Sequence, residues 1–242
     1  MSYFNFFPKV NYKFGDETTP DAITNISLYS SVVDELRENV SFYFDYTVPE
    51  FERPDQTSFK LYGTSDYYWT FYMLNDHIRE RGWALTNREL IEKIRADYPD
   101  TVITTKTSLT DRFKVGQTIT GNITGISGTI RHRNLDLGQL VITNITGTFQ
   151  DGETVSSTNT SGVVETIVVD SSSLEYLAAH HYENADKEYV DIDPSVGPGA
   201  LLTEITYEDR YIAFNEELKD IRIIKPDLIS QVVRAFREAM RS

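Results

Sequence analysis

Phe113-Lys-Val-Gly-Gln-Thr-Ile119 recurs 36 residues later as Phe149-Gln-Asp-Gly-Glu-Thr-Val155. Short runs of β-branched residues follow the two copies, for example residues 139–143 and 165–169, and they are separated by Gly and Asn residues. Such runs are typical of strands that are joined by turns. The repeated stretch therefore predicts a small all-β domain in the middle of the chain.

The composition of residues 105–170 supports this boundary. The range holds 14 Thr and 8 of the 13 Gly residues, but only Phe113 and Phe149 among the aromatic residues. Each copy is followed by a Thr/Ser/Gly-rich run that ends in a Thr-Ile pair, which is Thr129-Ile130 after the first copy and Thr166-Ile167 after the second. A flexible Thr/Gly linker is the alternative, and the two phased phenylalanines argue against it. Two copies are also too few for a solenoid, which usually needs at least about three.

Charge and composition exclude several classes of protein. The chain has 242 residues, with 23 Lys and Arg against 37 Asp and Glu, which gives a net charge of −14. It has no Cys, so disulfides, thiolate nucleophiles and Cys-bound zinc are excluded. The acidic balance argues against nucleic-acid binding. No apolar run approaches the ~20 residues of a membrane span, and residues 1–10 do not resemble a secretory signal.

The residues before the predicted insertion indicate mixed helix and strand. Apolar residues at helical spacing predict a helix over 28–40, and alternation predicts a strand over 42–46. Thr64 is a helix-start residue before the apolar run 67–74, and Thr86 with Glu89 forms a capping box before another helix. The run 67–74 is apolar on nearly every side, so we expect Trp69 to be buried in the core.

The residues after the insertion indicate the same mixture. We predict a helix over 172–179, a loop over 191–199, a helix after the cap residue Thr206, a strand over 221–224 and a closing amphipathic helix after Pro226. The fold class is therefore α+β. Residues 1–104 and 171–242 would form a discontinuous main domain, and residues 105–170 an inserted β domain.

A search for catalytic or metal-binding residues finds no convincing set. None of the four His residues lies in a recognisable nucleophile motif, and no phosphate-binding glycine motif occurs. His180 and His181 could supply metal ligands, together with the nearby acidic residues Glu183, Asp186, Asp191 and Asp193. Adjacent His residues on a helix, however, point about 100° apart and do not form the usual zinc pair. We expect no enzyme activity, no cofactor and no metal.

The net charge is negative over residues 171–220 and positive over residues 221–242. Residues 171–220 hold 12 acidic and 3 basic residues, whereas residues 221–242 hold 5 basic and 2 acidic residues. This asymmetry favours docking of a partner on the basic residues Arg234, Arg237 and Arg241. The alternative is that these side chains only interact with the dipole of their own helix.

An ordered set of short segments resembles a known family. The chain is similar to the small baseplate wedge subunit of T-even-like contractile-tailed bacteriophages over residues 1–100 and 171–242, but not over the insertion. No single segment is specific, and the order of the set carries the resemblance. The segments are Phe4-Asn-Phe-Phe-Pro8, Leu61-Tyr-Gly63, Tyr68-Trp69, Met73-Leu-Asn-Asp76, Gly82-Trp83 and Ile221-Arg-Ile-Ile-Lys225.

Part of this set also resembles a second kind of domain. Leu61-Tyr-Gly63, Tyr68-Trp69 and Asn75 look like a LysM module, which has two strands and two helices and binds N-acetylglucosamine polymers in other proteins. The LysM-like region would span about residues 53–100. A LysM-type module that binds peptidoglycan or chitin is therefore the alternative function.

The wedge resemblance implies a structural role without chemistry. The protein would bind other wedge subunits and sheath-initiator or hub proteins, with six copies in each baseplate. It would be assembled in the host cytoplasm and would end in the tail baseplate of the virion. The implied partner-binding residues are Phe4, Phe6 and Phe7 near the start and Arg234, Arg237 and Arg241 near the end.

Overall fold

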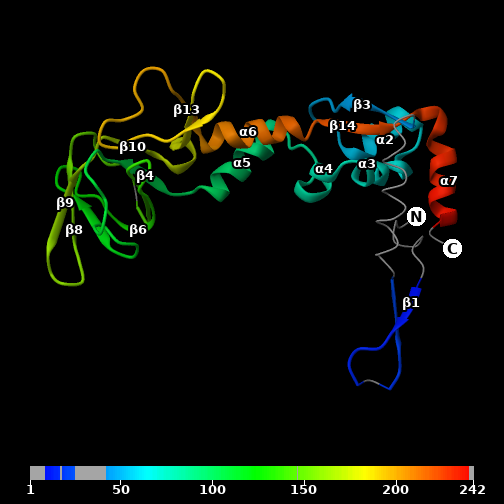
Figure 1. Cartoon of the computed structure of the whole chain (residues 1–242), viewed down its shortest axis with the longest axis horizontal. Coiled ribbons are helices and arrows are strands. Elements are labelled where there is room, and N and C mark those ends of the chain that lie inside the picture. The colour runs from blue at the N-terminus through cyan, green and yellow to red at the C-terminus, as the bar shows by residue number, and fades with distance from the viewer. Residues whose placement is uncertain (1–8, 17, 25–41, 146, 240–242) are drawn as a thin grey trace. The chain divides into compact units, whose positions relative to one another are not determined.

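The computed structural model describes residues 9–16, 18–24, 42–145 and 147–239. They form helices and several antiparallel sheets (Figure 1), so the predicted α+β class is confirmed. The chain divides into two compact units. Unit 1 comprises residues 1–86 and 215–242, and unit 2 comprises residues 87–214. The helix predicted over 28–40 lies outside the described residues.

The described residues of unit 1 form two separate two-stranded sheets. Strand β1 (Lys9–Tyr12) pairs with β2 (Asp21–Thr24), and strand β3 (Tyr43–Thr47) pairs with β14 (Asp220–Ile224). Both pairs are antiparallel. The second pair joins segments from the two ends of the sequence, and its strands agree with those predicted over 42–46 and 221–224.

The helices of unit 1 begin and end where the local sequence indicates. The Thr64 hydroxyl accepts a hydrogen bond from the Asp66 N–H at the start of η3, and Gly63 ends α2 with a positive φ of 72°. The predicted closing helix is confirmed, although it begins with a 3₁₀ turn at Pro226. The helices among the described residues of this unit are α2 (Pro54–Tyr62), η3 (Ser65–Tyr67), α3 (Trp69–Leu74), α4 (Asp76–Arg81), η5 (Pro226–Leu228) and α7 (Ile229–Ala239).

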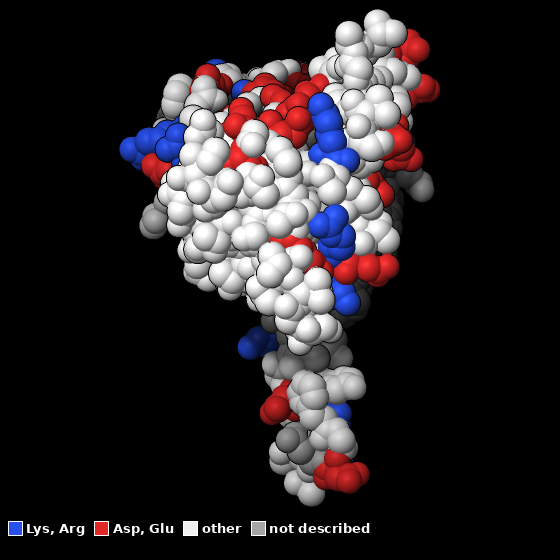
Figure 2. Space-filling model, turned by 90° about the vertical axis from the view of Figure 1, so that its left-hand side faces the viewer, with Lys and Arg blue, Asp and Glu red and all other residues white. Residues whose placement is uncertain are grey.

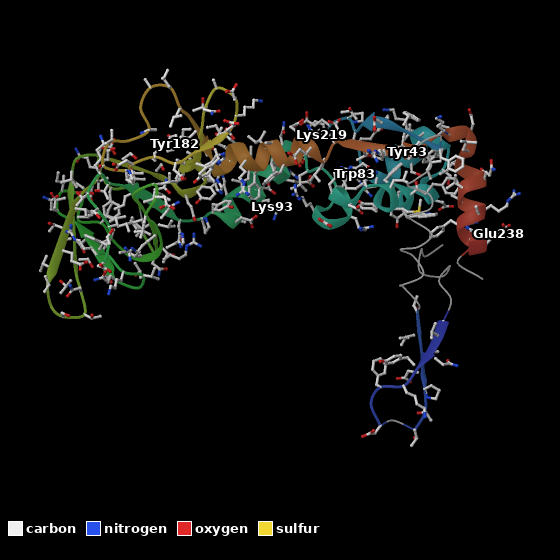
Figure 3. The ribbon with its side chains drawn as sticks, in the orientation of Figure 1. Tyr43, Trp83, Lys93, Tyr182, Lys219 and Glu238 are labelled. Atoms are coloured by element: carbon white, nitrogen blue, oxygen red, sulfur yellow. The ribbon has the colours of Figure 1, made fainter. Side chains whose placement is uncertain are left out.

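The core of unit 1 brings the two parts of the sequence together. Trp69 of α3 is only 7% exposed, as predicted, and its ring centroid lies 4.8 Å from that of Phe236 on α7. Trp83, labelled in Figure 3, packs on Phe71, and its Nε1–H donates to the Glu52 carbonyl over 2.8 Å. Burying these large rings removes much apolar area from water and holds α3 against α7.

The secondary structure of the predicted LysM-like region differs from that of a LysM module. Residues 53–100, all of which the structure describes, contain helices but no strand. Leu61 and Tyr62 lie in the last turn of α2, because Gly63 ends that helix. The two strands that the resemblance implies are therefore absent from this range, and the strands of unit 1 come from residues 9–24, 43–47 and 220–224.

Unit 2 is built on a seven-stranded antiparallel sheet in the order β10-β4-β7-β6-β5-β8-β9. One face covers a core that includes Phe113 and Phe149. A second sheet has the order β12-β11-β13. The elements are α5 (Asn87–Asp97), β4 (Thr101–Thr104), β5 (Thr118–Gly121), β6 (Ser127–Asn134), β7 (Gln139–Thr143), β8 (Thr154–Thr158), β9 (Val164–Val168), β10 (Ser171–Leu174), η4 (Glu175–Leu177), β11 (Ala179–Glu183), β12 (Tyr189–Val190), β13 (Thr203–Thr206) and α6 (Tyr207–Glu217), whose last three residues belong to unit 1.

The sheet extends beyond the predicted insertion. Strand β4 pairs with β7, and β10 pairs with β4, so the expected boundaries at 104/105 and 170/171 fall inside one sheet. The helix predicted over 172–179 is wrong. This range forms β10, the single 3₁₀ turn η4 and the first residue of β11. Backbone pairing with β4 outweighs the helical spacing of Leu174, Leu177 and Ala178.

The two repeat copies form equivalent turns. The Gly116 N–H donates to the Ile130 carbonyl, and the Gly152 N–H donates to the Val169 carbonyl, each over 2.8 Å. Thr118 pairs with Thr129 in the first copy, and Thr154 pairs with Val168 in the second. The residue of the second copy that is equivalent to Thr129 is thus Val168 and not Thr166, because the hairpin of the second copy is longer.

The second copy contains a buried carboxylate. Glu153 accepts hydrogen bonds from the N–H groups of Gln150 and Thr124 and from the Thr124 hydroxyl. A Cβ atom on Gly121 would approach both Glu153 oxygens to 2.8 Å, so only glycine leaves room for this carboxylate. Glu153, the Gln/Glu position of the Phe-x-x-Gly-[Gln/Glu]-Thr repeat, therefore stabilises the turn in which it lies by accepting hydrogen bonds from that turn.

The outward face of β5, β6, β8 and β9 carries a group of uncharged residues. Figure 2, which views the side on which β8 and β9 lie in Figure 1, shows a broad area without charged residues. Side chains alternate across a strand, so every second residue of these strands faces solvent and the residues between them face the core. The outward positions are Thr118, Thr120, Ser127, Thr129, Thr154, Ser156, Thr158, Val164, Thr166 and Val168.

Candidate functional site

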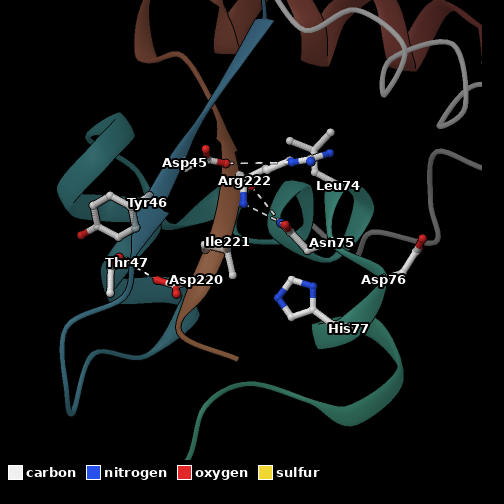
Figure 4. Close-up of a pocket in the computed structure, with 10 residues that line it drawn as sticks. All are labelled: Asp45, Tyr46, Thr47, Leu74, Asn75, Asp76, His77, Asp220, Ile221 and Arg222. Carbon is white, nitrogen blue, oxygen red and sulfur yellow. Dashed lines mark hydrogen bonds and ion pairs between the residues drawn. The ribbon is translucent and has the colours of Figure 1, made fainter. Parts of the chain in front are cut away.

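A cavity of about 750 Å³ lies in unit 1 beside the β3–β14 sheet. Figure 4 shows its walls, which come from β3, from β14 and from the junction between α3 and α4. These elements are distant in the sequence and are brought together by the core of unit 1. The polar residues that matter most in the walls are Asp45, Thr47, Asn75, His77, Asp220 and Arg222.

Asn75 fixes the shape of this cavity. Its Nδ2 atom donates to the carbonyls of Phe71 and Arg222, each over 2.8 Å, and its Oδ1 atom accepts from the Arg222 N–H over 2.7 Å. The side chain is 4% exposed. The Asn75 amide thus bonds both the N–H and the carbonyl of Arg222. A neighbouring strand would bond the same two groups on the edge of β14 that faces away from β3.

The charges of the cavity come mainly from the two strands. The Thr47 hydroxyl donates to Asp220 over 2.7 Å, and the Arg222 guanidinium lies 3.9 Å from the Asp45 carboxylate. The Arg222–Asp45 pair is exposed, so it adds little stability and leaves both groups accessible. The buried Nε2 atom of His77 has no hydrogen-bond partner within the described part of the chain. This arrangement suits a polar or positively charged side chain of a partner.

Sequence reasoning missed this cavity. Asp45 and Asp220 lie on strands from opposite ends of the chain, and no local spacing connects them. The one available signal is Met73-Leu-Asn-Asp76, in which an Asn follows an apolar helix. That signal predicts the end of α3 but not the strand that Asn75 contacts.

The predicted partner-binding residues are only partly described. Phe4, Phe6, Phe7 and Arg241 lie outside the described residues. On α7, Arg234 is exposed and Arg237 is half-buried. The buried residues of the same helix are Ile229, Val232, Val233 and Phe236, so Arg234 lies on the side away from the core. Among the described residues of the predicted set, Arg234 is the most accessible to a partner.

The two adjacent histidines lie on β11 and not on a helix. The Arg210 guanidinium lies 2.6 Å from His180 Nε2, the two Nδ1 atoms lie 2.9 Å apart, and His181 Nε2 lies 3.0 Å from Glu183 Oε1. Because Arg always donates, His180 must accept at Nε2 and donate from Nδ1 to His181. Burial lowers the pKa of His180, and the nearby Arg210 and His181 act in the same direction. The result is a chain of hydrogen bonds that orders β11 against α6.

A second, smaller cavity of about 350 Å³ lies in unit 2. Its lining includes Thr104, Lys106, Asp170 and Ser171, together with residues of the loop 191–199. The Thr104 and Ser171 hydroxyls lie 2.7 Å apart, and Lys106 pairs with Asp170 over 3.4 Å. These polar groups are paired with one another, and the lining includes none of the buried polar atoms that lack a partner among the described residues, whereas the cavity of unit 1 includes His77 Nε2.

Metal-binding clusters and membrane-spanning helices are both absent from the described residues. No group of three or more His, Asp or Glu side chains within them is arranged to hold a metal ion. None of their helices combines the length and the apolar character that crossing a bilayer requires. The comparisons with known proteins add no assignment, because no family model matches the chain and no curated protein matches it.

Proposed function

We propose that the protein is a structural component of a contractile-tail baseplate, where it binds neighbouring wedge subunits and helps to join the wedges around the central hub. It acts through protein contacts with other wedge proteins and with sheath-initiator or hub proteins, in six copies per baseplate. In this proposal it is assembled in the host cytoplasm and resides in the virion.

One observation carries the proposal. The described segments that resemble the wedge family lie within residues 61–83 and 221–225, which are more than 130 residues apart in the sequence, yet both ranges belong to unit 1. Asn75 binds the backbone of Arg222, and the Tyr62 hydroxyl donates to the Ile224 carbonyl over 2.9 Å. The described segments of the set therefore belong to one compact unit, which supports treating them as parts of one domain.

The surface of unit 1 suits a role in assembly. Arg234 on α7 presents a positive charge, and the cavity beside β3 and β14 presents Asp45 and Asp220. Opposite charges on separate surfaces allow one subunit to orient different neighbours. A standard interface buries about 1,600 Å² in total, so a subunit of this size has room for several.

Native mass spectrometry with co-expressed candidate wedge proteins tests the proposal. We expect a stable complex with the wild-type chain. Replacing Arg234 and Arg241 by Glu should weaken it, more strongly at low salt, because screening is least there. Arg237 is left unchanged because it is half-buried. Arg88→Glu, at an exposed position of unit 2, is the matched control and should leave the complex intact.

Glycan binding is the second candidate, and exposed aromatic rings are the observation in its favour. Tyr68 is 43% exposed and Phe59 is 64% exposed, whereas Trp69 and Phe71 are buried. A calorimetric titration with chitooligosaccharides separates the two proposals. Under the baseplate proposal we expect no heat of binding, and saturable binding that Tyr68→Ala removes would favour the glycan module instead.

A further inference from the structure

The β1–β2 hairpin leaves apolar side chains in solvent. Val10, Tyr12, Phe14 and Ile23 are 43%, 52%, 51% and 39% exposed, respectively. The Tyr12 and Phe14 rings contact each other edge to face at 4.9 Å. A two-stranded sheet by itself is marginally stable in water, and exposed apolar residues on one favour a further partner.

Strand β3 has an open edge. Among the described residues only β14 pairs with it. The Val48 N–H donates to Lys219, and the Lys225 N–H donates to Phe42. In an antiparallel ladder the bonded pairs alternate, so the backbone groups of residues 44 and 46 face β14 and those of residues 45 and 47 face away. Such an edge is a template for another strand.

The side chains of β1 and β3 complement each other when odd-numbered residues lie opposite odd-numbered residues. Lys9 then shares one face with Asp45, whose side chain is 95% exposed, and so does Lys13, the residue after β1, if the strand continues by one residue in the complex. Val10 and Tyr12 share the other face with Phe44. Cross-strand pairs of opposite charge and of apolar residues stabilise a sheet. Strand β2 begins with an acidic residue, Asp21, and fits Asp45 less well.

We propose that β1 of one copy adds to the open edge of β3 in a second copy and so joins the two chains through a four-stranded sheet. Within the described part of one chain the hairpin and β3 belong to separate sheets, and no described strand pairs with the outer edge of β3 or with either outer edge of the hairpin. The contact joins two different surfaces and therefore closes a ring or continues as a filament. This inference does not depend on the proposed function.

Two complementary variants test it. The first lacks residues 2–24 and keeps the β3 edge; its core should remain, because no residue of the hairpin belongs to the buried clusters of unit 1. The second is Asp45→Pro, which keeps the hairpin and removes the outward N–H of β3. In sedimentation velocity we expect wild-type chains to self-associate with concentration. Each variant alone should be monomeric, and a mixture should form a one-to-one dimer.

Charge variants provide a second test that does not use proline. Asp45→Lys should weaken self-association by about tenfold, since it replaces attraction to Lys9 and Lys13 by repulsion. Adding Lys9→Glu and Lys13→Glu to it should restore association. Glu80→Lys, an exposed position of the same unit with the same change of charge, should have no effect. A wild-type chain that stays monomeric up to about 200 μM, as it would if the hairpin paired within its own chain, would overturn the inference.

Discussion

At the scale of single residues, Asn75 is the position on which unit 1 depends most directly. Its carboxamide meets two backbone carbonyls and one backbone N–H, and these come from α3 and from β14. Both functions of the amide are used, because the nitrogen donates and the oxygen accepts. No other natural side chain of the same size offers this combination, so substitution leaves buried groups without partners.

Asn75→Asp should destabilise unit 1 by about 2–4 kcal/mol. The change removes the donor to Phe71 and Arg222 and places a carboxylate in a buried site. Urea unfolding measures the difference. Asn134→Asp is the control, because Asn134 Oδ1 only accepts from the N–H groups of Asp136 and Leu137 and an Asp can do the same. Equal effects of the two changes would contradict the role of the Asn75 donor.

Trp69→Ala should cost about 3–5 kcal/mol, because it removes a large buried ring that packs on Phe236. The measurement is again the free energy of unfolding, combined with the wedge-binding and chitooligosaccharide titrations. Tyr68→Ala, on the neighbouring exposed position, should cost far less. A stable Trp69→Ala protein that had lost glycan binding would show that the ring serves a ligand.

At the scale of elements, strands with regular apolar patterns were predictable and strands without them were not. Residues 139–143 form β7 as predicted, since Leu140, Val141 and Ile142 are all buried. Strand β10 has the sequence Ser-Ser-Ser-Leu and is a strand because its backbone pairs with β4. Local propensity says little about such a segment. The same holds for the cavity of unit 1, whose walls meet only through tertiary contacts.

Glu165 gives unit 2 a predictable dependence on pH. Its carboxylate accepts from the Phe113 N–H over 2.8 Å and from Asn159, and it therefore links β9 to the first repeat turn. The Phe113 hydrogen bond, with smaller contributions from Asn159 and Arg112, holds the pKa of Glu165 below its ordinary value of 4.5, although burial acts in the opposite direction. Ionised Glu165 thus stabilises the folded state above that value, and this stabilisation is lost as the pH falls through the folded pKa.

Glu165→Gln should therefore flatten the acid side of the stability curve of unit 2. Gln can still accept from the Phe113 N–H, so the fold should remain at pH 7. Urea unfolding at pH 7, 5, 4 and 3 measures the slope for both proteins. Glu92→Gln on the exposed face of α5 is the control and should leave the slope unchanged. An unchanged slope in Glu165→Gln would mean that other carboxyl groups determine acid unfolding.

At the scale of the whole molecule, the composition of the chain located the insertion but not its ends. The Thr/Gly-rich range stops at residues 105 and 170, whereas the compact unit runs from 87 to 214. Helices α5 and α6 and strands β4 and β10 have ordinary compositions, so no change in residue usage marks them. The junction itself is marked by Asn215, whose side chain accepts from the Leu85 N–H and donates to the Leu85 carbonyl.

Removing residues 87–214 should leave a folded unit 1. Asn215 holds the two ends of the deletion together at Leu85, so a short Gly/Ser linker from Thr86 to Asn215 should suffice. Calorimetry should show one cooperative transition. Removing only residues 105–170 should fail, because it takes β7 away from β4 and exposes the core around Ile103. The reverse outcome would place the boundary where the composition changes.

The pairing of β3 with β14 also sets an order of events during synthesis. Thr47 and Asp220, which bond across the two strands, are 173 residues apart. At about 5–20 residues per second, β3 leaves the ribosome roughly 9–35 s before its partner exists. All of unit 2 is made in that interval. Unit 1 therefore closes last. Until then β3 lacks the partner strand that it has in the folded chain, so a chaperone or a neighbouring nascent chain can bind to it in the cell.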